Sequence, residues 1–505
     1  MILSTVQRRG AWLLYYIFLA ALLAANSFGY LDPDFGWHLK VGETIAREKA
    51  VPSEQLYMWS LGEAHWVDHE WLSNLITYGL WSLGGYVAVS VFFILLPLIS
   101  LALINRYVFN NYLHKTREQV AFACFGTAAL FACLPHFGVR MQEFSFLFFS
   151  ILLIIIDQYR RTLNLKNIYW LIPLLFVWAC THGSFLIGVA TVLGWMFYEL
   201  LFKRRKTNKY IFLIGALAIA ATLATPYGLK LYSFLSDYGT NRYYLSHIEE
   251  WRSPYSHSIR YDQIIYTLIS FTLMLGAWLF SKQRWPLWQF LILMALLAAA
   301  TRSVRHFPLL AVGTLLFALP NPLSNLLNKT LPYSKMLNNL LIVCLFLASL
   351  GLVAQSKYTQ NPFQSYCQNF PCGAVQFLRD KAEYSSLKLF NDYGWGGYLI
   401  AAKPEQKVFI DGRLPQYPFA GHTMLEEYSE FFKIGNSEKK LDEYGIELIM
   451  FKSKEKPFEP DWIERFVLGK EYKTRFNPLI EFLKNSQRWK VIYSDETATL
   501  YARVN

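Results

Sequence analysis

The chain has 505 residues, of which 54% are hydrophobic and only 17% are charged. This balance excludes an ordinary soluble globular protein and predicts a polytopic membrane protein. The net charge of +12 does not indicate nucleic-acid binding, because the Lys and Arg residues occur in short clusters between apolar runs, as topology signals do.

About eleven apolar runs qualify as transmembrane helices on the criterion of roughly 20 residues for a span, fewer where flanking residues snorkel. The first run follows Arg8 and Arg9 without a small-residue cleavage site, so we expect it to be retained as a first span. The predicted spans are 12–28, 86–105, 120–135, 144–156, 168–180, 185–201, 210–224, 264–280, 287–300, 307–319 and 337–354.

Basic residues in every second loop predict the orientation of these spans, because such residues stay on the cytoplasmic side. The clusters are Arg8 and Arg9, Arg106 to Arg117, Arg160 to Lys166, Lys203 to Lys209, Lys282 and Arg284, and Lys329 and Lys335. We therefore expect a cytoplasmic N-terminus. The loops 31–71, 136–143, 182–184, 226–262 and 302–306, and everything after residue 355, are expected outside the cytoplasm.

The first external loop, 31–85, begins with LDPDFGWHLKVGE and is rich in acids and aromatic residues. Pro33 stiffens the turn between Asp32 and Asp34, so the two carboxylates can converge on one polar atom. Converging acids supply either a general base or, together with His38, a site for a divalent cation such as Mg²⁺ or Mn²⁺. A solvated turn is the alternative explanation for so short a motif.

The remainder of this loop predicts two helices on the membrane surface, at 37–48 and 69–83, because aromatic and charged residues alternate at helical spacing. Gly84 and Gly85 then allow a turn into the second span. The tryptophans of the loop, Trp37 among them, also fit a simple aromatic belt at the membrane interface.

After residue 355 the chain becomes polar and is long enough to fold on a core of its own. We expect an extracytoplasmic α/β domain at 355–505, after a transmembrane domain at 1–354. In that compartment Cys367 and Cys372 can form a disulfide. The predicted strands are 387–390, 407–410, 446–451, 490–493 and 498–502, with helices at 373–382 and in parts of 417–441.

The external loops carry cationic or protonatable residues that the topology rule does not explain. They are Arg140, His182, Arg252, Arg302, Arg305 and His306. A polyanion held near the membrane surface explains them, because Arg binds phosphate oxygens in a bidentate manner. The alternatives are contacts with lipid headgroups or ion pairs with Glu143, Glu249 or Glu250.

Taken together, several motifs resemble the GT-C superfamily of integral membrane glycosyltransferases, which includes oligosaccharyltransferases and protein O-mannosyltransferases. The stretches DPDFGWHLKVGE, HWVDHEWL, EEWRSP, NDYGWGGYLI and VFIDGR look like those of a large group of bacterial membrane proteins in the GT-C class. Gly36 stands where such proteins often carry a second aromatic residue. There is no WWDYG-like acceptor motif, so block transfer of an oligosaccharide to Asn is not expected.

The resemblance implies an inverting transferase of the bacterial inner membrane that takes a sugar from a polyprenyl-phosphate or polyprenyl-diphosphate donor. The acceptor is a glycan, lipid or protein outside the cytoplasm, and membrane lipids surround the enzyme. Asp34 matches the base that activates the acceptor, with Asp32 assisting or contacting a cation. Arg302, Arg305, Arg140 and Lys40 are expected to bind the donor phosphate. The substrate-binding candidates are His38, Trp37, Glu70, His182, Glu250 and Arg252. Asp411 and Arg413 either shape the acceptor site or dock the C-terminal domain.

Two other classes of function remain open on the sequence. A transporter or flippase for lipid-linked glycans places charges at mid-membrane on broken helices, whereas here they gather at span ends. A non-enzymatic envelope assembly protein would act through its C-terminal domain. Replacing Asp34 by Asn discriminates between them, because only a catalyst loses turnover while binding is preserved.

Overall fold

The computed structural model describes residues 5–202, 208–256, 260–280, 286–327, 335–419, 421–454, 459–466, 469–471 and 477–504. The predicted topology residues Lys203, Lys282, Arg284 and Lys329 lie outside this range. The chain forms two compact units. The first unit comprises Met1–Tyr30, Val87–Leu231 and Ser246–Tyr358, and the second comprises Leu31–Tyr86, Tyr232–Leu245 and Thr359–Asn505. This division differs from a single boundary at 354/355, since the first external loop belongs to the same unit as the C-terminal residues.

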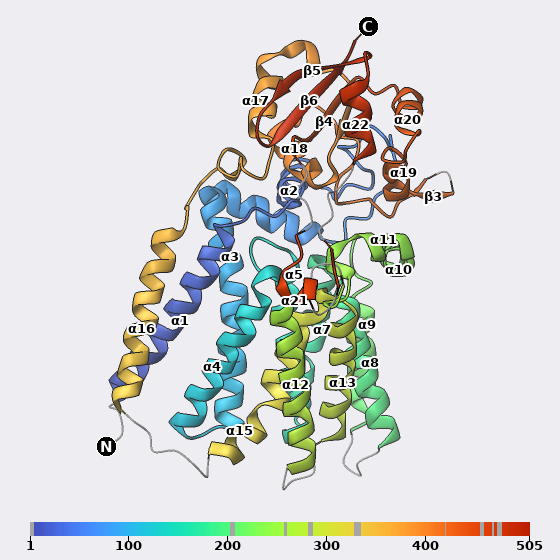
Figure 1. The fold of residues 1–505 in the computed structure, drawn as a ribbon. Helices are drawn as coiled ribbons and strands as arrows, with labels where there is room; N and C mark the ends of the chain where they lie inside the picture. Colours follow the sequence, from blue (N-terminus) through green and yellow to red (C-terminus); the bar gives the residue numbers. More distant parts are fainter. Residues whose placement is uncertain are drawn as a thin grey trace. The chain divides into compact units, whose positions relative to one another are not determined.

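The first unit is built of apolar helices. α1 and α16, which come from opposite ends of this unit's sequence, pack side by side (Figure 1). The helices of this unit, some of which extend into the second, are α1 (Thr5–Ser27), α3 (Trp71–Asn111), α4 (Thr116–Cys133), α5 (Gln142–Thr162), α6 (Leu165–Ile168), α7 (Leu171–Thr181), α8 (Phe185–Leu201), α9 (Tyr210–Ala221), α12 (Tyr261–Phe280), α13 (Leu287–Arg302), α14 (Phe307–Gly313), α15 (Pro320–Leu327) and α16 (Lys335–Gln355).

Four helices in the described part of the chain are long and apolar enough to cross a membrane, judged by length and composition. They are Gly10–Ser27, Trp71–Asn111, Thr116–His136 and Gln142–Thr162. The other apolar helical stretches whose side chains are described have 10–17 residues, so the count of about eleven spans stays a prediction.

The helix α3 contains the turn predicted at its glycines. Gly84 and Gly85 have non-helical dihedral angles, with φ of −164° and +60°. A positive φ is readily adopted only by glycine. The chain therefore leaves the first part of α3, which begins at Trp71, and enters the long apolar part through this break. The predicted helix at 37–48 is also confirmed, as α2 (Phe35–Glu48).

The second unit contains a four-stranded sheet with strand order β1-β4-β6-β5, in which β1 is parallel to β4 and the other pairs are antiparallel. Its strands are β1 (Leu389–Asn391), β4 (Leu448–Lys452), β5 (Trp489–Ser494) and β6 (Ala498–Arg503), with a separate hairpin of β2 (Pro418–Phe419) and β3 (His422–Thr423). Its helices are α2, α10 (Leu229–Thr240), α11 (Arg242–His247), α17 (Cys372–Asp380), α18 (Gly396–Ala402), α19 (Met424–Glu430), α20 (Ser437–Glu443), α21 (Trp462–Phe466) and α22 (Pro478–Asn485).

The strand predicted at 407–410 is wrong, although the other four predicted strands are found. Val408 forms only an isolated bridge with Met58. The side chain of Asn391, buried at the end of β1, accepts from the amide of Phe409 at 2.8 Å and donates to the carbonyl of Ile410 at 2.9 Å. The amide of Phe409 and the carbonyl of Ile410 thus form hydrogen bonds with a side chain. In a strand, these groups would bond to the backbone of a neighbouring strand.

Cys367 and Cys372 form a disulfide just before and at the start of α17. Phe390 of β1 stacks on Phe431 with ring centroids 4.3 Å apart, and on Phe451 of β4 at 5.6 Å. Such aromatic burial supplies much of the apolar area that holds a small sheet and its helices together.

Candidate functional site

The DPD turn ends in the residue that starts α2. Asp32 is 7% exposed, and its Oδ1 accepts from the backbone amide of Asp34 at 2.9 Å. Asp34 is the N-cap of α2 but makes no side-chain capping bond, and it is partly exposed. The two carboxylates therefore have different environments, since Asp32 stabilises the turn while the Asp34 carboxylate is turned to other neighbours.

The carboxylate of Asp34 lies against Gly412 of the VFIDGR segment. A β-carbon on Gly412 would collide with Oδ1 of Asp34, so the approach requires glycine at this position. Tyr393, from the NDYGWGG segment, lies nearby. Burial raises the pKa of Tyr393 well above its usual value, and the neighbouring Tyr244 and Asp34 raise it further. Segments from opposite ends of the chain thus meet at Asp34.

Two glycines allow the helices that carry these segments to touch. A β-carbon on Gly36 of α2 would collide with the carbonyl of Gly397 in α18, and one on Gly397 would collide with the carbonyl of Pro33. This contact explains why Gly36 stands where similar proteins often carry an aromatic residue. The backbone of Gly397 occupies the space that an aromatic side chain would fill.

Beside Gly412, Asp411 and Arg413 form an ion pair with both side chains fully buried. Arg413 Nε donates to Asp411 Oδ1 at 2.9 Å and Nη2 donates to Oδ2 at 2.7 Å. The guanidinium also lies over the rings of Tyr57 and Trp66, each at 5.0 Å. Such bidentate pairing and stacking are specific to Arg. The pair fixes the backbone on which the Asp34 carboxylate rests.

A buried polar network lies along α2 and the start of α3. His38 Nδ1 is 2.6 Å from Asn74 Oδ1, and the amide of Asn74 donates to both oxygens of Asp68, at 3.0 and 2.9 Å. Burial lowers the pKa of His38 to about 3 and raises that of Asp68 to about 7. Glu70 Oε2 is 4.0 Å from His38 Nε2.

The substrate-binding candidates of this loop are therefore placed inside the second unit. Trp37, His38 and Glu70 are between 4% and 7% exposed. Their contact with a substrate stays a prediction, while their observed partners position α2. Asn74 and Asp68 were not predicted from sequence. The signal available for Asp68 was the acidic HWVDHEWL stretch, which does not reveal that Asn74 links it to His38, 36 residues before Asn74.

In the described residues, no group of three or more His, Cys, Asp or Glu is arranged to hold a metal ion. The predicted ligands do not assemble into one, since Asp32 accepts from a backbone amide and His38 bonds to Asn74. Dependence on Mg²⁺ or Mn²⁺ stays a prediction, and no step below is routed through a metal.

In the first unit, Arg140 and Arg305 both bind Glu250. Arg305 Nη1 is 3.1 Å from Glu250 Oε2, and Arg140 pairs with Oε1. Burial alone would raise the pKa of Glu250, but Arg140 and Arg305 outweigh it and hold the pKa at about 2. Arg305 also lies over Trp251 at 4.9 Å. The cluster of Arg140, Glu250 and Arg305 carries two cations for one anion.

His182 joins this cluster, because its Nε2 is 3.4 Å from Arg305 Nη2. Its Nδ1 lies 2.7 Å from the hydroxyl of Ser184 and 3.0 Å from that of Ser145. The backbone carbonyl of Arg252 accepts a hydrogen bond from the backbone amide of Val304, in the turn that carries Arg305. Arg302 is exposed at the last position of α13.

Lys40, the fourth predicted phosphate ligand, belongs to the second unit. Its ammonium group pairs with Glu43 at 2.8 Å and lines a cavity described below. The four predicted phosphate ligands thus divide into the pair Arg140 and Arg305, an exposed Arg302, and a Lys40 that has an acidic partner.

No protein-family model matches the chain, and no curated protein matches it in sequence. Its fold is similar to solved structures of the oligosaccharyltransferase AglB from Archaeoglobus fulgidus. The apo form and a complex with an inhibitory peptide and a dolichol-phosphate each give a TM-score of 0.52 at 11% identity. A form tethered to an acceptor peptide with the NVT sequon gives 0.54 at 12% identity. Each match covers 87% of this chain and 69% of the other. The chain thus has a mostly helical fold similar to that of AglB.

Proposed function

We propose that this protein is a membrane glycosyltransferase that moves a sugar from a polyprenyl-phosphate or polyprenyl-diphosphate donor to an acceptor outside the cytoplasm. The observation that carries the proposal is the position of Asp34. Its partly exposed carboxylate lies against Gly412, and the turn that contains Asp34 packs on Gly397. Segments that are distant in the sequence therefore fix the position of this one carboxylate. A carboxylate in a solvated turn needs no such support.

Asp34 acts as the general base. It takes the proton of the acceptor hydroxyl as the acceptor oxygen attacks the anomeric carbon of the donor. The bond between this carbon and the phosphate oxygen breaks, and its electron pair leaves with the phosphate. A single displacement of this kind inverts the configuration at the anomeric carbon.

Arg140 and Arg305 bind the donor phosphate. Both guanidinium groups already bind an anion, the carboxylate of Glu250, and the cluster keeps one excess positive charge. Guanidinium groups stabilise charge that grows on phosphate oxygens, and in a preorganised site such stabilisation is a large part of catalysis. Glu250 holds the two side chains in place before the donor arrives.

The disulfide of Cys367 and Cys372 supports an extracytoplasmic location of the second unit, because disulfides persist in oxidising compartments. The apolar helices and the fold shared with AglB support a membrane enzyme with a lipid-linked donor. The acceptor is a glycan, a lipid or a protein, and the inner membrane of a bacterium is the proposed location.

The test is complementation of a host that lacks the gene, with mass spectrometry of lipid-linked sugars and envelope glycans. Wild type is expected to restore the product, whereas Asp34→Asn leaves the lipid-linked donor to accumulate, with transfer reduced by about 10²–10⁴-fold. The matched control is Asp237→Asn, an exposed carboxylate of the same unit. Equal product from Asp34→Asn and wild type, at equal membrane levels, contradicts the proposal and favours a transporter or an assembly protein.

A further inference from the structure

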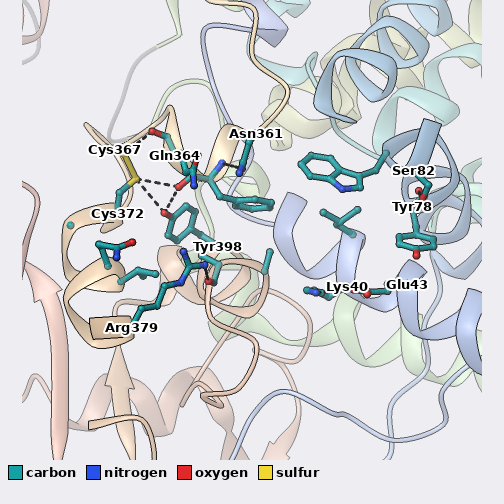
Figure 2. Close-up of a pocket in the computed structure, with 18 residues that line it drawn as sticks. Lys40, Glu43, Tyr78, Ser82, Asn361, Gln364, Cys367, Cys372, Arg379 and Tyr398 are labelled. Atoms are coloured by element: carbon teal, nitrogen blue, oxygen red, sulfur yellow. Dashed lines mark hydrogen bonds and ion pairs between the residues drawn. A yellow bond between two sulfur atoms is a disulfide. The ribbon is translucent and has the colours of Figure 1, made fainter. Parts of the chain in front are cut away.

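The second unit contains a cavity of about 900 Å³ that none of the steps above uses. Its walls come from α2, the start of α3, the segment 361–379 and α18, and Figure 2 shows the side chains that line it. Small-molecule sites occupy roughly 300–1,000 Å³, so this cavity is near the upper end of that range and has room for several linked rings.

One side of the cavity is aromatic. The ring of Phe363 lies 6.0 Å from that of Trp81 and 5.7 Å from that of Tyr398. The hydroxyl of Tyr398 donates to the carbonyl of Phe363 at 2.6 Å, and Phe35 stacks on Phe363 from behind at 5.8 Å. Tyr398 is 2% exposed and supports the ring of Phe363, whereas Phe363 and Trp81 are partly exposed and held in place before a ligand binds.

The remainder of the lining is polar and carries one net positive charge, that of Arg379. Lys40 is neutralised by Glu43 at 2.8 Å, and Arg379 donates to the carbonyl of Ala402. The lining also contains side-chain amides and a hydroxyl, from Asn361, Gln364, Gln376 and Ser82. In Figure 2, Arg379 and the pair of Lys40 and Glu43 lie at opposite ends of the cavity.

We propose that this cavity binds an uncharged oligosaccharide. A sugar ring has apolar C–H faces, which pack on aromatic rings, and a rim of hydroxyl groups, each of which both donates and accepts. Amide side chains match that rim, because each has an acceptor oxygen and two donor hydrogens. An acyl chain would need a continuous apolar lining. A peptide that binds by adding a strand would need a free strand edge, and helices and loops form these walls.

The helix α2 connects this cavity to Asp34. Asp34 is its N-cap, and Lys40 follows six positions later, which corresponds to about 9 Å along the helix axis. The cavity and the proposed base therefore share one helix, and an oligosaccharide of several sugar units is long enough to extend from one toward the other. The assignment to the glycan substrate rests on the proposed function, whereas binding in the cavity is measured independently of transfer.

The test uses the full-length protein in detergent, titrated with maltotriose and chitotriose by calorimetry and saturation-transfer NMR. Ser82→Trp fills the cavity from an exposed position without removing any packing, and Leu83→Trp is the matched control at a neighbouring residue that is 84% exposed and does not line the cavity. We expect at least one trisaccharide to bind wild type and Leu83→Trp equally, and Ser82→Trp to bind at least tenfold more weakly.

Binding of neither trisaccharide at 10-mM concentrations, or equal binding to Ser82→Trp and wild type, overturns the inference. So does a hydrophilic peptide that binds in place of the sugars and is lost in Ser82→Trp. Asp34→Asn is expected to retain trisaccharide binding while losing transfer. A protein that binds the sugar but transfers nothing in any form refutes the proposed enzyme and leaves the cavity assignment intact.

Discussion

Arg413 Nη2 lies 2.7 Å from Asp411 Oδ2, and both side chains of this ion pair are fully excluded from solvent. Removing one partner of a buried pair leaves an uncompensated charge, which costs about 3–5 kcal/mol of stability. The pair is next to Gly412, on which Asp34 rests, so its loss affects both stability and the position of the proposed base.

Arg413→Leu is therefore expected to lower the unfolding temperature of the solubilised protein strongly. The matched control is Arg488→Leu, whose ion pairs with Glu438 and Asp442 are exposed and are expected to contribute less than about 1 kcal/mol. Thermal unfolding monitored by tryptophan fluorescence measures both. If the unfolding temperature fell equally in the two variants, the buried ion pair would contribute no more to stability than the exposed ion pairs.

Gly412→Ala is expected to reduce transfer far more than it reduces stability. The added methyl meets the far end of the Asp34 side chain, which can rotate away, so the fold tolerates it while the carboxylate moves. A displacement of about 1 Å at a reacting group costs on the order of 10²-fold in rate. Transfer rate and unfolding temperature are measured on the same preparation.

The control for this variant is Gly79→Ala, since a β-carbon there meets nothing within 4 Å. Alanine is the better helix former, so Gly79→Ala is expected to be neutral or slightly stabilising and fully active. Unchanged transfer in Gly412→Ala would mean that Asp34 does not depend on this contact.

The stability of the second unit is expected to depend on pH through Asp68. Burial raises its pKa to about 7 from 3.8, so between about pH 4 and pH 7 the folded state keeps a proton that the unfolded state loses. Stability contributed by this group therefore falls as pH rises through that window, by up to roughly 1.4 kcal/mol per pH unit.

Asp68→Asn removes this loss of stability at rising pH, because an amide has no proton to lose between about pH 4 and pH 7. The difference in unfolding temperature, variant minus wild type, is expected to increase from pH 4.5 to pH 7.5. His38, whose pKa burial lowers to about 3, acts in the opposite direction in both proteins. A difference that is constant with pH contradicts the burial of an ionisable Asp68.

The orientation of the second unit is tested with a single free thiol, in a protein whose four free cysteines, Cys124, Cys133, Cys180 and Cys344, are all replaced by Ser. In Cys372→Ser, Cys367 loses its disulfide partner, and a membrane-impermeant maleimide added to intact spheroplasts is expected to label it. The opposite control is His114→Cys, in the basic loop between α3 and α4, made in a Cys367→Ser and Cys372→Ser background. It is expected to react only after permeabilisation, and the reverse pattern would invert the predicted topology.

Local patterns were sufficient to predict the elements that depend on neighbouring residues. The helix at 37–48 and the turn at Gly84 and Gly85 follow from periodicity and from the freedom of glycine. The segment 407–410 was misassigned, because its β-like composition does not reveal that the side chain of Asn391 and the carbonyl of Tyr57 occupy its backbone groups.

The environment of Asp34 could not be predicted, although the motifs that form it were recognised one by one. The contact of Asp34 with Gly412 joins residues 378 positions apart, and nothing local in either sequence encodes it. In the same way, Gly36 suggested a missing ring, and only the structure shows the Gly397 carbonyl in its place. Charge pattern did single out Arg140, Glu250 and Arg305, which the fold brings together.

The close crossing of α2 and α18 also has a consequence for biosynthesis. Gly36 leaves the ribosome 361 residues before Gly397, which at about 5–20 residues per second is a delay of roughly 20–70 s. During that interval the glycine face of α2 lacks the neighbour against which it is shaped. Nascent chains stalled or truncated before residue 396 therefore expose this face to chaperones and proteases, which makes completion of translation a checkpoint for assembly.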